Sequence, residues 1–141
     1  TILGNRFAGL LHTINDSIGD RIQATDGNCT LIYGEDKIVE NLLGLNFEIS
    51  MQSFFQTNPK CAEKLYAKVI EYVKCTQDKQ EVVLDLFCGT GTIGQLIAAQ
   101  LPNIEVIGVD IVPEAITDAK KNAKLIQNNL IRNSIFFCKV I

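Results

Sequence analysis

Residues 82–94 have the sequence VVLDLFCGTGTIG. The stretch begins with apolar residues, turns at closely spaced glycines and continues with the apolar spacing of a helix, at Ile93, Leu96, Ile97 and Leu101. This pattern predicts a strand, a tight loop and a helix N-terminus, which is the opening unit of a parallel α/β sheet. Glycines in such a loop allow positive φ angles and let a ligand approach the backbone closely. The stretch therefore predicts a site for a nucleotide-containing cofactor.

The identity of that cofactor depends on the acidic residues around the loop. Gly89, Gly91 and Gly94 match G-x-G-x-x-G, and Asp110 ends the next apolar run, which together fit a dinucleotide (NAD) fingerprint. Asp85 argues against NAD, because a carboxylate beside a pyrophosphate in a shielded site is unfavourable. S-adenosylmethionine (SAM) has no phosphate, and its ammonium group would be attracted to this acid. We therefore predict SAM rather than NAD, while a glycine turn that binds no ligand stays open.

Composition limits the class of protein. The chain has 141 residues, of which 47% are hydrophobic and 21% charged, as expected for a globular protein with one core, or one core and a small satellite. A net charge of −3 gives no support for RNA binding, and five cysteines without a C-x-x-C pair, with one histidine, predict no metal site. No signal peptide or spanning segment is apparent, so we expect a cytoplasmic protein. The missing initiator Met suggests that the chain is part of a longer protein.

The chain divides into two regions. Residues 1–52 contain short apolar runs separated by turn signals and predict a small subdomain of three or four antiparallel strands. Residues 53–141 are predicted to form the N-terminal half of a Rossmann-like domain. This half begins with a helix for which Asn58 is the cap and Pro59 the first residue. Its predicted apolar stripe consists of Ala62, Leu65, Tyr66, Val69, Ile70 and Val73.

After the glycine loop the pattern alternates between strands and helices. Residues 104–110 predict a second parallel strand, Pro113 opens a helix, and residues 135–138 predict a third strand. The fold class is therefore α/β, a partial Rossmann-like fold of order β-α-β-α-β behind a small antiparallel region. The expected strand order 3-2-1 leaves the strand with Asp85 at the edge of the sheet. An apolar edge is a place where a homodimer could form.

Gln56 has two interpretations from its position alone. It stands beside Phe54 and Phe55, just before the cap at Asn58, where an amide without a partner is unfavourable. In one interpretation the segment is a hydrophobic staple, with a phenylalanine packed on the first helical turn. In the other, the amide points into the ligand pocket. Spacing does not decide between them.

Three blocks together resemble the RNA uracil-5-methyltransferase family, the SAM-dependent enzymes that make 5-methyluridine in tRNA or rRNA. These blocks are SFFQTN at 53–58, DLFCGTGTIG at 85–94, and GVD at 108–110 with Asn122 and Ala123 downstream. The glycine block is shared by many methyltransferases, whereas its combination with the Phe-Phe-Gln block is specific to this family. The resemblance covers roughly residues 31 to 139.

The resemblance implies a SAM-binding role for several residues. Gln56 would contact SAM near the transferred methyl, which favours the functional interpretation. Asp110, where the family more often has Glu, would accept hydrogen bonds from the ribose hydroxyls. The glycine block would supply the rest of the pocket, so that with Asp85 the predicted cofactor-binding residues are Gln56, Asp85, Phe87, Gly89, Gly91, Thr92 and Asp110.

The resemblance also implies that the catalytic residues lie outside this chain. In the family a cysteine thiolate adds to carbon 6 of uracil, carbon 5 takes the methyl group, and a glutamate near the C-terminus removes the proton. By this resemblance the cysteine and the glutamate both lie beyond Ile141, so we expect no catalytic residue here and no turnover by the chain alone. Cys88 lies in the cofactor loop and is not expected to be the nucleophile. Other possibilities are a SAM methyltransferase with another substrate, an NAD-binding domain, or a non-enzymatic remnant that assembles through its exposed strand.

Overall fold

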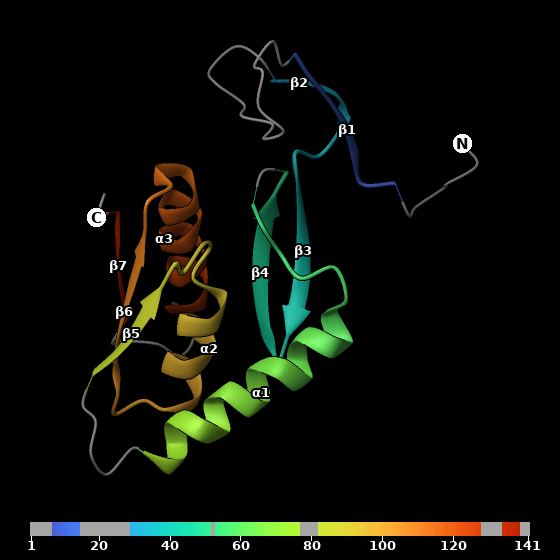
Figure 1. Ribbon diagram of the computed structural model, residues 1–141. Helices are drawn as coiled ribbons and strands as arrows, with labels where there is room; N and C mark the ends of the chain where they lie inside the picture. The colour runs from blue at the N-terminus through green and yellow to red at the C-terminus, as the bar shows by residue number, and fades with distance from the viewer. Residues whose placement is uncertain (1–6, 15–28, 52, 77–81, 128–133, 139–141) are drawn as a thin grey trace.

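The structure, a computed structural model, describes residues 7–14, 29–51, 53–76, 82–127 and 134–138. In these residues two β-hairpins precede a three-stranded sheet with its helices (Figure 1). The elements are β1 (Gly9–Thr13), β2 (Cys29–Gly34), β3 (Lys37–Leu42), β4 (Leu45–Ser50), α1 (Pro59–Cys75), β5 (Val82–Leu86), α2 (Thr92–Gln100), β6 (Glu105–Asp110), α3 (Pro113–Gln127) and β7 (Ser134–Cys138). The α/β fold predicted from the sequence is confirmed.

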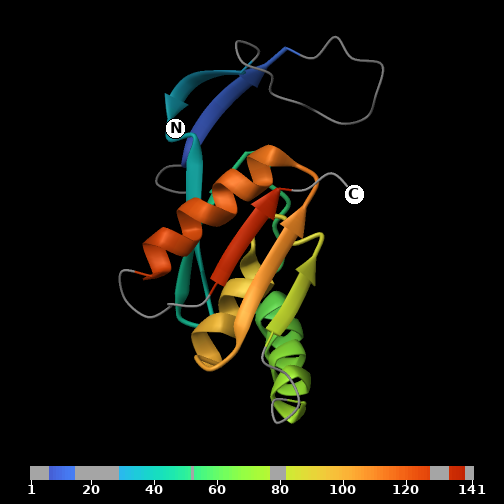
Figure 2. The same cartoon turned by 90° about the vertical axis from the view of Figure 1, so that its left-hand side faces the viewer.

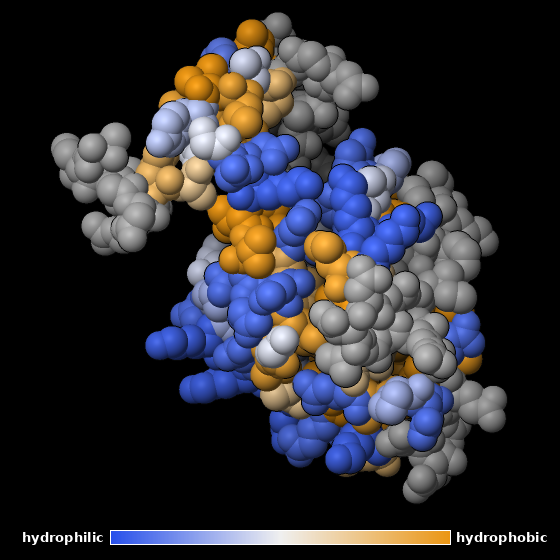
Figure 3. Space-filling model, turned by 180° about the vertical axis from the view of Figure 1, so that it is seen from behind, coloured by the Kyte–Doolittle hydropathy of each residue, from blue (hydrophilic) through white to orange (hydrophobic). Residues whose placement is uncertain are grey.

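The β1–β2 hairpin lies at the top of Figure 1, apart from the three helices. Its strands pair antiparallel, with an irregularity in register between Leu10 and Leu11. Several of its large side chains are exposed, namely Leu10, Leu31, Ile32 and Tyr33. Figure 3 shows apolar surface over this hairpin at the top of the view. The hairpin therefore contributes little to the buried core.

The sheet behind the glycine loop is parallel and has the order β5-β6-β7. This confirms the predicted strand order, with β5 at the edge. Figure 2 looks onto the open face of this sheet, with α1 and α2 behind it. On β5, Val83 and Asp85 are half-buried toward the helices, whereas Val82, Leu84 and Leu86 are exposed. One face of an apolar edge strand is therefore left uncovered by the described residues.

Helix α1 begins as predicted. The Asn58 side chain accepts a hydrogen bond from the backbone N–H of Cys61 at 3.1 Å, and Pro59 occupies the first turn. Ala62, Tyr66 and Ile70 of the predicted stripe are buried. The prediction was wrong for Leu65, which is 52% exposed, because the elements packed on α1 cover a narrower strip than the sequence pattern suggests. None of the helices in the described part of the chain combines the length and apolarity needed to cross a membrane.

The β3–β4 hairpin packs into the same core as the helices. Leu42 and Phe47 are fully buried and belong to one cluster with Tyr66 of α1 and Leu96 of α2. Because residues 37–50 share this core, the β3–β4 hairpin helps to position the Rossmann-like part. The boundary between residues 1–52 and 53–141 stays a prediction.

The Asn122 side chain joins α3 to the backbone of β4. Asn122 is 1% exposed; its Oδ1 accepts the backbone N–H of Glu48 at 2.8 Å, and its Nδ2 donates to the Glu48 carbonyl at 3.0 Å. The amide thus pairs with β4 as a neighbouring strand would. Both backbone groups would lose their partners without it, and unsatisfied buried groups are costly.

We predict that Asn122→Ala lowers the free energy of unfolding by about 1–3 kcal/mol, the usual cost of a buried hydrogen-bonding group left unpaired. Urea denaturation would measure the loss. Asn46→Ala is the matched control, because the Asn41–Asn46 side-chain bond is exposed and its loss should change stability far less. Equal effects of the two substitutions would contradict this account of α3 and β4.

Candidate cofactor-binding site

The glycine loop connects β5 to α2 through residues 87–91. Gly89 has a φ of 54°, and Gly91 caps α2 with a φ of 73°, both in the left-handed region. A Cβ built on Gly89 would meet no atom within 4 Å, so glycine is required there by its φ angle rather than by crowding. The backbone at Gly89 therefore faces open space, as a ligand-binding loop requires.

Asp85 holds the start of α2. Its Oδ2 accepts the backbone N–H of Gly94 at 3.0 Å, and a Cβ on Gly94 would lie 3.0 Å from the same oxygen. The third glycine of the G-x-G-x-x-G pattern is therefore needed for close approach between α2 and β5. The structure places Asp85 at the helix N-terminus, where a negative charge is favourable.

Asp110 holds the loop from the neighbouring strand. Its Oδ2 accepts the backbone N–H of Gly89 at 2.8 Å, and its Oδ1 accepts that of Val112 at 2.9 Å. The side chain is only 9% exposed. Each carboxylate oxygen has a second lone pair, so the predicted contact with ribose hydroxyls is compatible with these bonds but is not tested by them.

The two carboxylates make the site electrostatically negative. Burial raises the pKa of Asp85 above its ordinary value of 3.8, the Gly94 hydrogen bond lowers it, and the nearby charge of Asp110 raises it. Burial, followed by the charges of Asp85 and Asp110, raises the pKa of Cys88 to about 12. Burial and Asp85 also raise the pKa of Tyr66 on α1. A cation would relieve this environment, whereas an anion such as a pyrophosphate would add to the repulsion.

Phe87 stands out on the same loop. It has a φ of 60°, which is unfavourable for a residue with a side chain, and its side chain is 86% exposed. A strained backbone and an exposed ring have no stabilising role in the described residues. Such features concentrate at ligand sites, which agrees with the predicted pocket role of Phe87 without testing it.

The remaining predicted residues lie on either side of the loop. Thr92 is buried in the first turn of α2, with its hydroxyl 3.0 Å from that of Thr90. Gln56 belongs to the segment that connects β4 to α1, two residues before the cap at Asn58, and its side chain is half-buried. Of the two phenylalanines beside it, Phe55 packs against Phe47 at 6.3 Å between ring centroids, whereas Phe54 is exposed. Among the described residues no hydrogen bond joins Gln56 to the glycine loop.

Sequence reasoning missed Gln95. This side chain is fully buried, and its Nε2 donates to the carbonyls of Thr90 at 3.1 Å and Ala119 at 3.2 Å, which ties the glycine loop to α3. Its Oε1 is also buried and has no hydrogen-bond partner in the described part of the chain. The available signal was an amide within an otherwise apolar helix, between Ile93 and Leu96.

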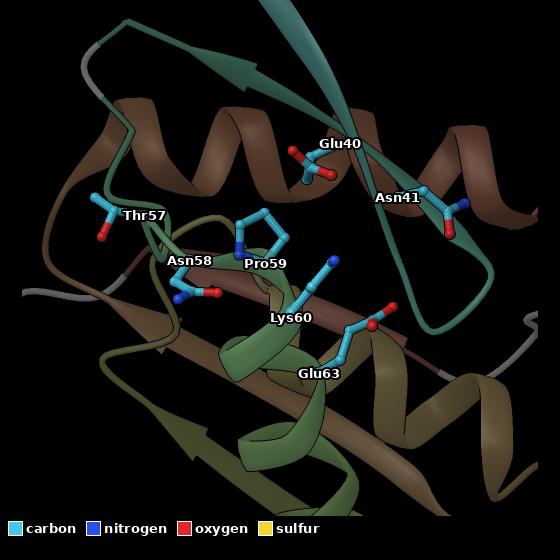
Figure 4. Close-up of a pocket in the computed structure, with 7 residues that line it drawn as sticks. All are labelled: Glu40, Asn41, Thr57, Asn58, Pro59, Lys60 and Glu63. Carbon is cyan, nitrogen blue, oxygen red and sulfur yellow. The ribbon is translucent and has the colours of Figure 1, made fainter.

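A separate groove lies at the N-terminus of α1 (Figure 4). It has a volume of about 460 Å³ and is open to solvent. Its lining comes from β3 and the start of α1: Glu40, Asn41, Thr57, Asn58, Pro59, Lys60 and Glu63. None of the predicted cofactor residues lines it, so we assign the candidate site to the glycine loop, where the strained backbone and the buried charges lie. No cluster of metal-binding side chains occurs among the described residues.

We predict that Asp85→Asn changes the pH dependence of stability. Because the folded carboxyl has a raised pKa, it holds its proton more tightly than the unfolded one, so the wild-type chain loses stability as pH rises from about 4 through the folded pKa. Asparagine keeps an oxygen for the Gly94 N–H but cannot ionise, so this loss should disappear. Urea denaturation at several pH values measures it, with Asp36→Asn on an exposed turn as control. An unchanged profile in Asp85→Asn would refute the assignment.

We also predict that Cys88 resists alkylation. A thiol with a pKa of about 12 is almost entirely protonated at pH 8, and the thiolate is the reactive form. Cys61 and Cys75 are exposed on α1 and serve as internal controls. Iodoacetamide labelling followed by peptide mass spectrometry should modify these two well before Cys88, and denaturant should abolish the difference. Labelling of Cys88 first would contradict the predicted environment.

Comparison with known proteins agrees with the geometry of the loop. A family model described as a methyltransferase domain matches residues 77–136. An RNA methyltransferase of Clostridium tetani is 50% identical over 122 residues, which cover 86% of this chain and 25% of that protein. One of Caldanaerobacter subterraneus is 44% identical over 128 residues, covering 91% of this chain and 26% of that protein. The chain thus spans about a quarter of the length of these relatives.

Solved structures show the same fold. The tRNA (uracil-54, C5)-methyltransferase of Pyrococcus abyssi, solved with S-adenosyl-L-homocysteine, has a TM-score of 0.64 and 28% identity, covering 85% of this chain and 29% of that one. A SAM-dependent methyltransferase of Agrobacterium tumefaciens has a TM-score of 0.60 at 24% identity, covering 79% and 36%, and supports the fold alone. The chain is therefore similar to RNA methyltransferases over about a quarter of their length, and residues 77–136 match a methyltransferase domain.

Proposed function

We propose that this chain carries the cofactor-binding part of a SAM-dependent RNA methyltransferase that acts on carbon 5 of a uridine in tRNA or rRNA in the cytoplasm. The observation that carries the cofactor assignment is the pair of carboxylates at the glycine loop: the buried Asp110 bonds the backbone of Gly89, and the half-buried Asp85 bonds that of Gly94 in the first turn of α2. They surround an open loop that suits a cationic ligand. SAM supplies an electrophilic methyl group on a sulfonium and has an ammonium group but no phosphate.

The residues of the chain would each hold a part of this cofactor. Asp85 would attract the ammonium group, and the backbone at Gly89 and Gly91 would lie against the methionine portion. Asp110 would accept hydrogen bonds from the ribose hydroxyls through its free lone pairs. Phe87 would exchange its exposed position for a contact with the cofactor, with Thr92 beneath it in the first turn of α2.

Gln56 would act from the opposite side of the pocket, near the methyl group. The choice of uridine as substrate rests on the Phe-Phe-Gln block at 54–56 together with the glycine block, and on the tRNA methyltransferase of P. abyssi being similar to this chain. The residues that would add to the uracil ring and remove its proton are not among those described here. For this chain we therefore propose binding of the cofactor, without turnover.

Two alternatives make different demands on the same residues. An NAD-binding domain would need a pyrophosphate beside Asp85, which the charge of that carboxylate opposes. The other alternative is a non-enzymatic protein that assembles through its exposed strand. One observation favours it, because the side chains of Val82, Leu84 and Leu86 are exposed on edge strand β5. Homodimer formation through this edge is compatible with cofactor binding and stays a prediction.

Calorimetric titration with S-adenosylhomocysteine, and separately with NAD, tests the cofactor assignment. We expect the chain to bind S-adenosylhomocysteine, and Asp110→Ala to weaken binding by about 1–3 kcal/mol, because ribose hydroxyls would be left without their acceptor. Glu105→Ala, at the other end of the same strand, is the matched control and should leave the affinity unchanged.

The outcomes separate the alternatives. Binding of NAD alone would overturn the SAM assignment. Binding of neither ligand would overturn the proposal that this chain holds the cofactor by itself. Since Asp110 also bonds the backbone of Gly89, a thermal melt of Asp110→Ala is needed to exclude unfolding as the reason for a weaker titration.

A further inference from the structure

A tight turn connects β4 to the Phe-Phe-Gln segment. The backbone N–H of Ser53 donates to the carbonyl of Ser50, the last residue of β4, at 3.1 Å. The two serine hydroxyls point to the same place, with their oxygens 2.7 Å apart. Three residues after this turn comes Gln56, so the turn determines the direction in which the chain approaches that residue.

Asp118 of α3 closes the turn from outside. Its Oδ2 lies 2.7 Å from the Ser50 hydroxyl and 2.8 Å from the Ser53 hydroxyl, so the three oxygens form a triangle. The two serine hydroxyls supply two protons for the three short oxygen–oxygen distances. Hydrogen bonds to a carboxylate are stronger than those to a neutral oxygen, which favours the two bonds to Asp118. The other oxygen, Oδ1, lies 3.7 Å from the exposed Nζ of Lys121, an ion pair that contributes little.

The same helix is attached to the glycine loop. Gln95 donates to the carbonyls of Thr90 in the loop and Ala119 of α3, and Asn122, one turn after Asp118, pairs with the backbone of Glu48 in β4. Helix α3 is thus fixed to the glycine loop by the buried amide of Gln95 and to β4 by the buried amide of Asn122. Asp118 adds the contact that fixes the turn after β4 to this frame.

The far end of the segment is anchored independently. Phe55 packs on Phe47 within the core, and Asn58 caps α1. Gln56 lies between these two anchors in the chain, and only Phe54 separates Phe55 from the turn at Ser50–Ser53. A change at the turn would therefore reach Gln56 through Phe54 and Phe55. The exposed Phe54 provides no packing contact that could replace the lost bonds.

We propose that Asp118 is a positioning residue for the cofactor site: its carboxylate holds the turn Ser50–Ser53 and thereby sets where Gln56 lies relative to the glycine loop. The inference rests on the proposed function, in which Gln56 contacts the cofactor. Asp118 itself would touch neither cofactor nor RNA. Its effect on binding would pass through Gln56, and this dependence can be measured.

A double-mutant cycle tests the dependence. The affinity for S-adenosylhomocysteine would be measured by calorimetry for the wild-type chain, Asp118→Ala, Gln56→Ala and the double variant. We expect Asp118→Ala to weaken binding roughly 5- to 50-fold in the wild-type background and less than about 3-fold in the Gln56→Ala background, since residues that act through one another are not additive. Asp118→Asn keeps one acceptor oxygen and should recover most of the affinity. Lys121→Ala removes the exposed partner of the same carboxylate and is the matched control.

Hydrogen exchange supplies a readout that does not depend on the cofactor. Asp118→Ala should speed exchange of the amides at residues 53–57 and leave those of β6 (Glu105–Asp110) unchanged, because only the turn loses a contact. If Asp118→Ala does not fold, the Ser50→Ala/Ser53→Ala double variant removes the same bonds from the other side and should give the same pattern.

The results separate failure of the inference from failure of the proposed function. If Gln56→Ala weakens binding while Asp118→Ala does not, the inference is overturned and the cofactor assignment stands. An equal loss in both backgrounds, or faster exchange throughout β6, would make Asp118 a general stabilising residue and also overturn it. A loss with Asp118→Ala but none with Gln56→Ala would overturn both the role of Gln56 and the inference. A wild-type chain that binds no S-adenosylhomocysteine overturns the proposed cofactor site and the inference that rests on it.

Discussion

Two carboxylates, the buried Asp110 and the half-buried Asp85, hold the backbone of the glycine loop and of the first turn of α2, and the geometry of the candidate site depends on them. Asp85 of β5 bonds Gly94 in the first turn of α2, and Asp110 of β6 bonds Gly89 in the loop. Two neighbouring strands therefore hold the loop and the start of the helix that follows it. Within the parallel pair Asp85 lies opposite Gly108, which has no side chain to compete for this space. Burial, and to a smaller extent the charge of Asp110, raises the pKa of Asp85, so the charged form of this carboxyl is unfavourable without a cation. The loop is therefore preorganised at a cost that a cationic ligand would offset.

The second constraint is helix α3, which connects the region of the glycine loop to strand β4. The carbonyl of Ala119 in α3 accepts a hydrogen bond from Gln95 of α2, and Asn122 of α3 bonds the backbone of β4. These amides are buried and bond to backbone atoms, so they fix the distance between elements more strictly than apolar contacts do. The β3–β4 hairpin is consequently part of the site's framework, although it precedes the glycine loop by a full helix in the sequence.

Local signals made part of this structure predictable. The order of strands and helices after residue 82 followed from apolar runs and glycines, and the start of α1 followed from Asn58 and Pro59, because these signals act within a few residues. The partners of Asn122 and Gln95 could not be predicted, since each bond joins residues far apart in the sequence whose proximity depends on the folded core. For the same reason the stripe on α1 was predicted too wide at Leu65.

Strand β5 connects the site to the surface that the described residues leave uncovered. All its residues except Asp85 are apolar, without the alternation of a strand that faces water on one side, and such strands occur where both faces of a parallel sheet are covered. Only the face of Val83 and Asp85 is covered here, while Leu84 and Leu86 are exposed. Phe87, strained and exposed, follows directly at the end of this strand. Any element that covers the open face of β5 must therefore approach the glycine loop as well, so covering of the sheet and closure of the cofactor site are connected through one short strand.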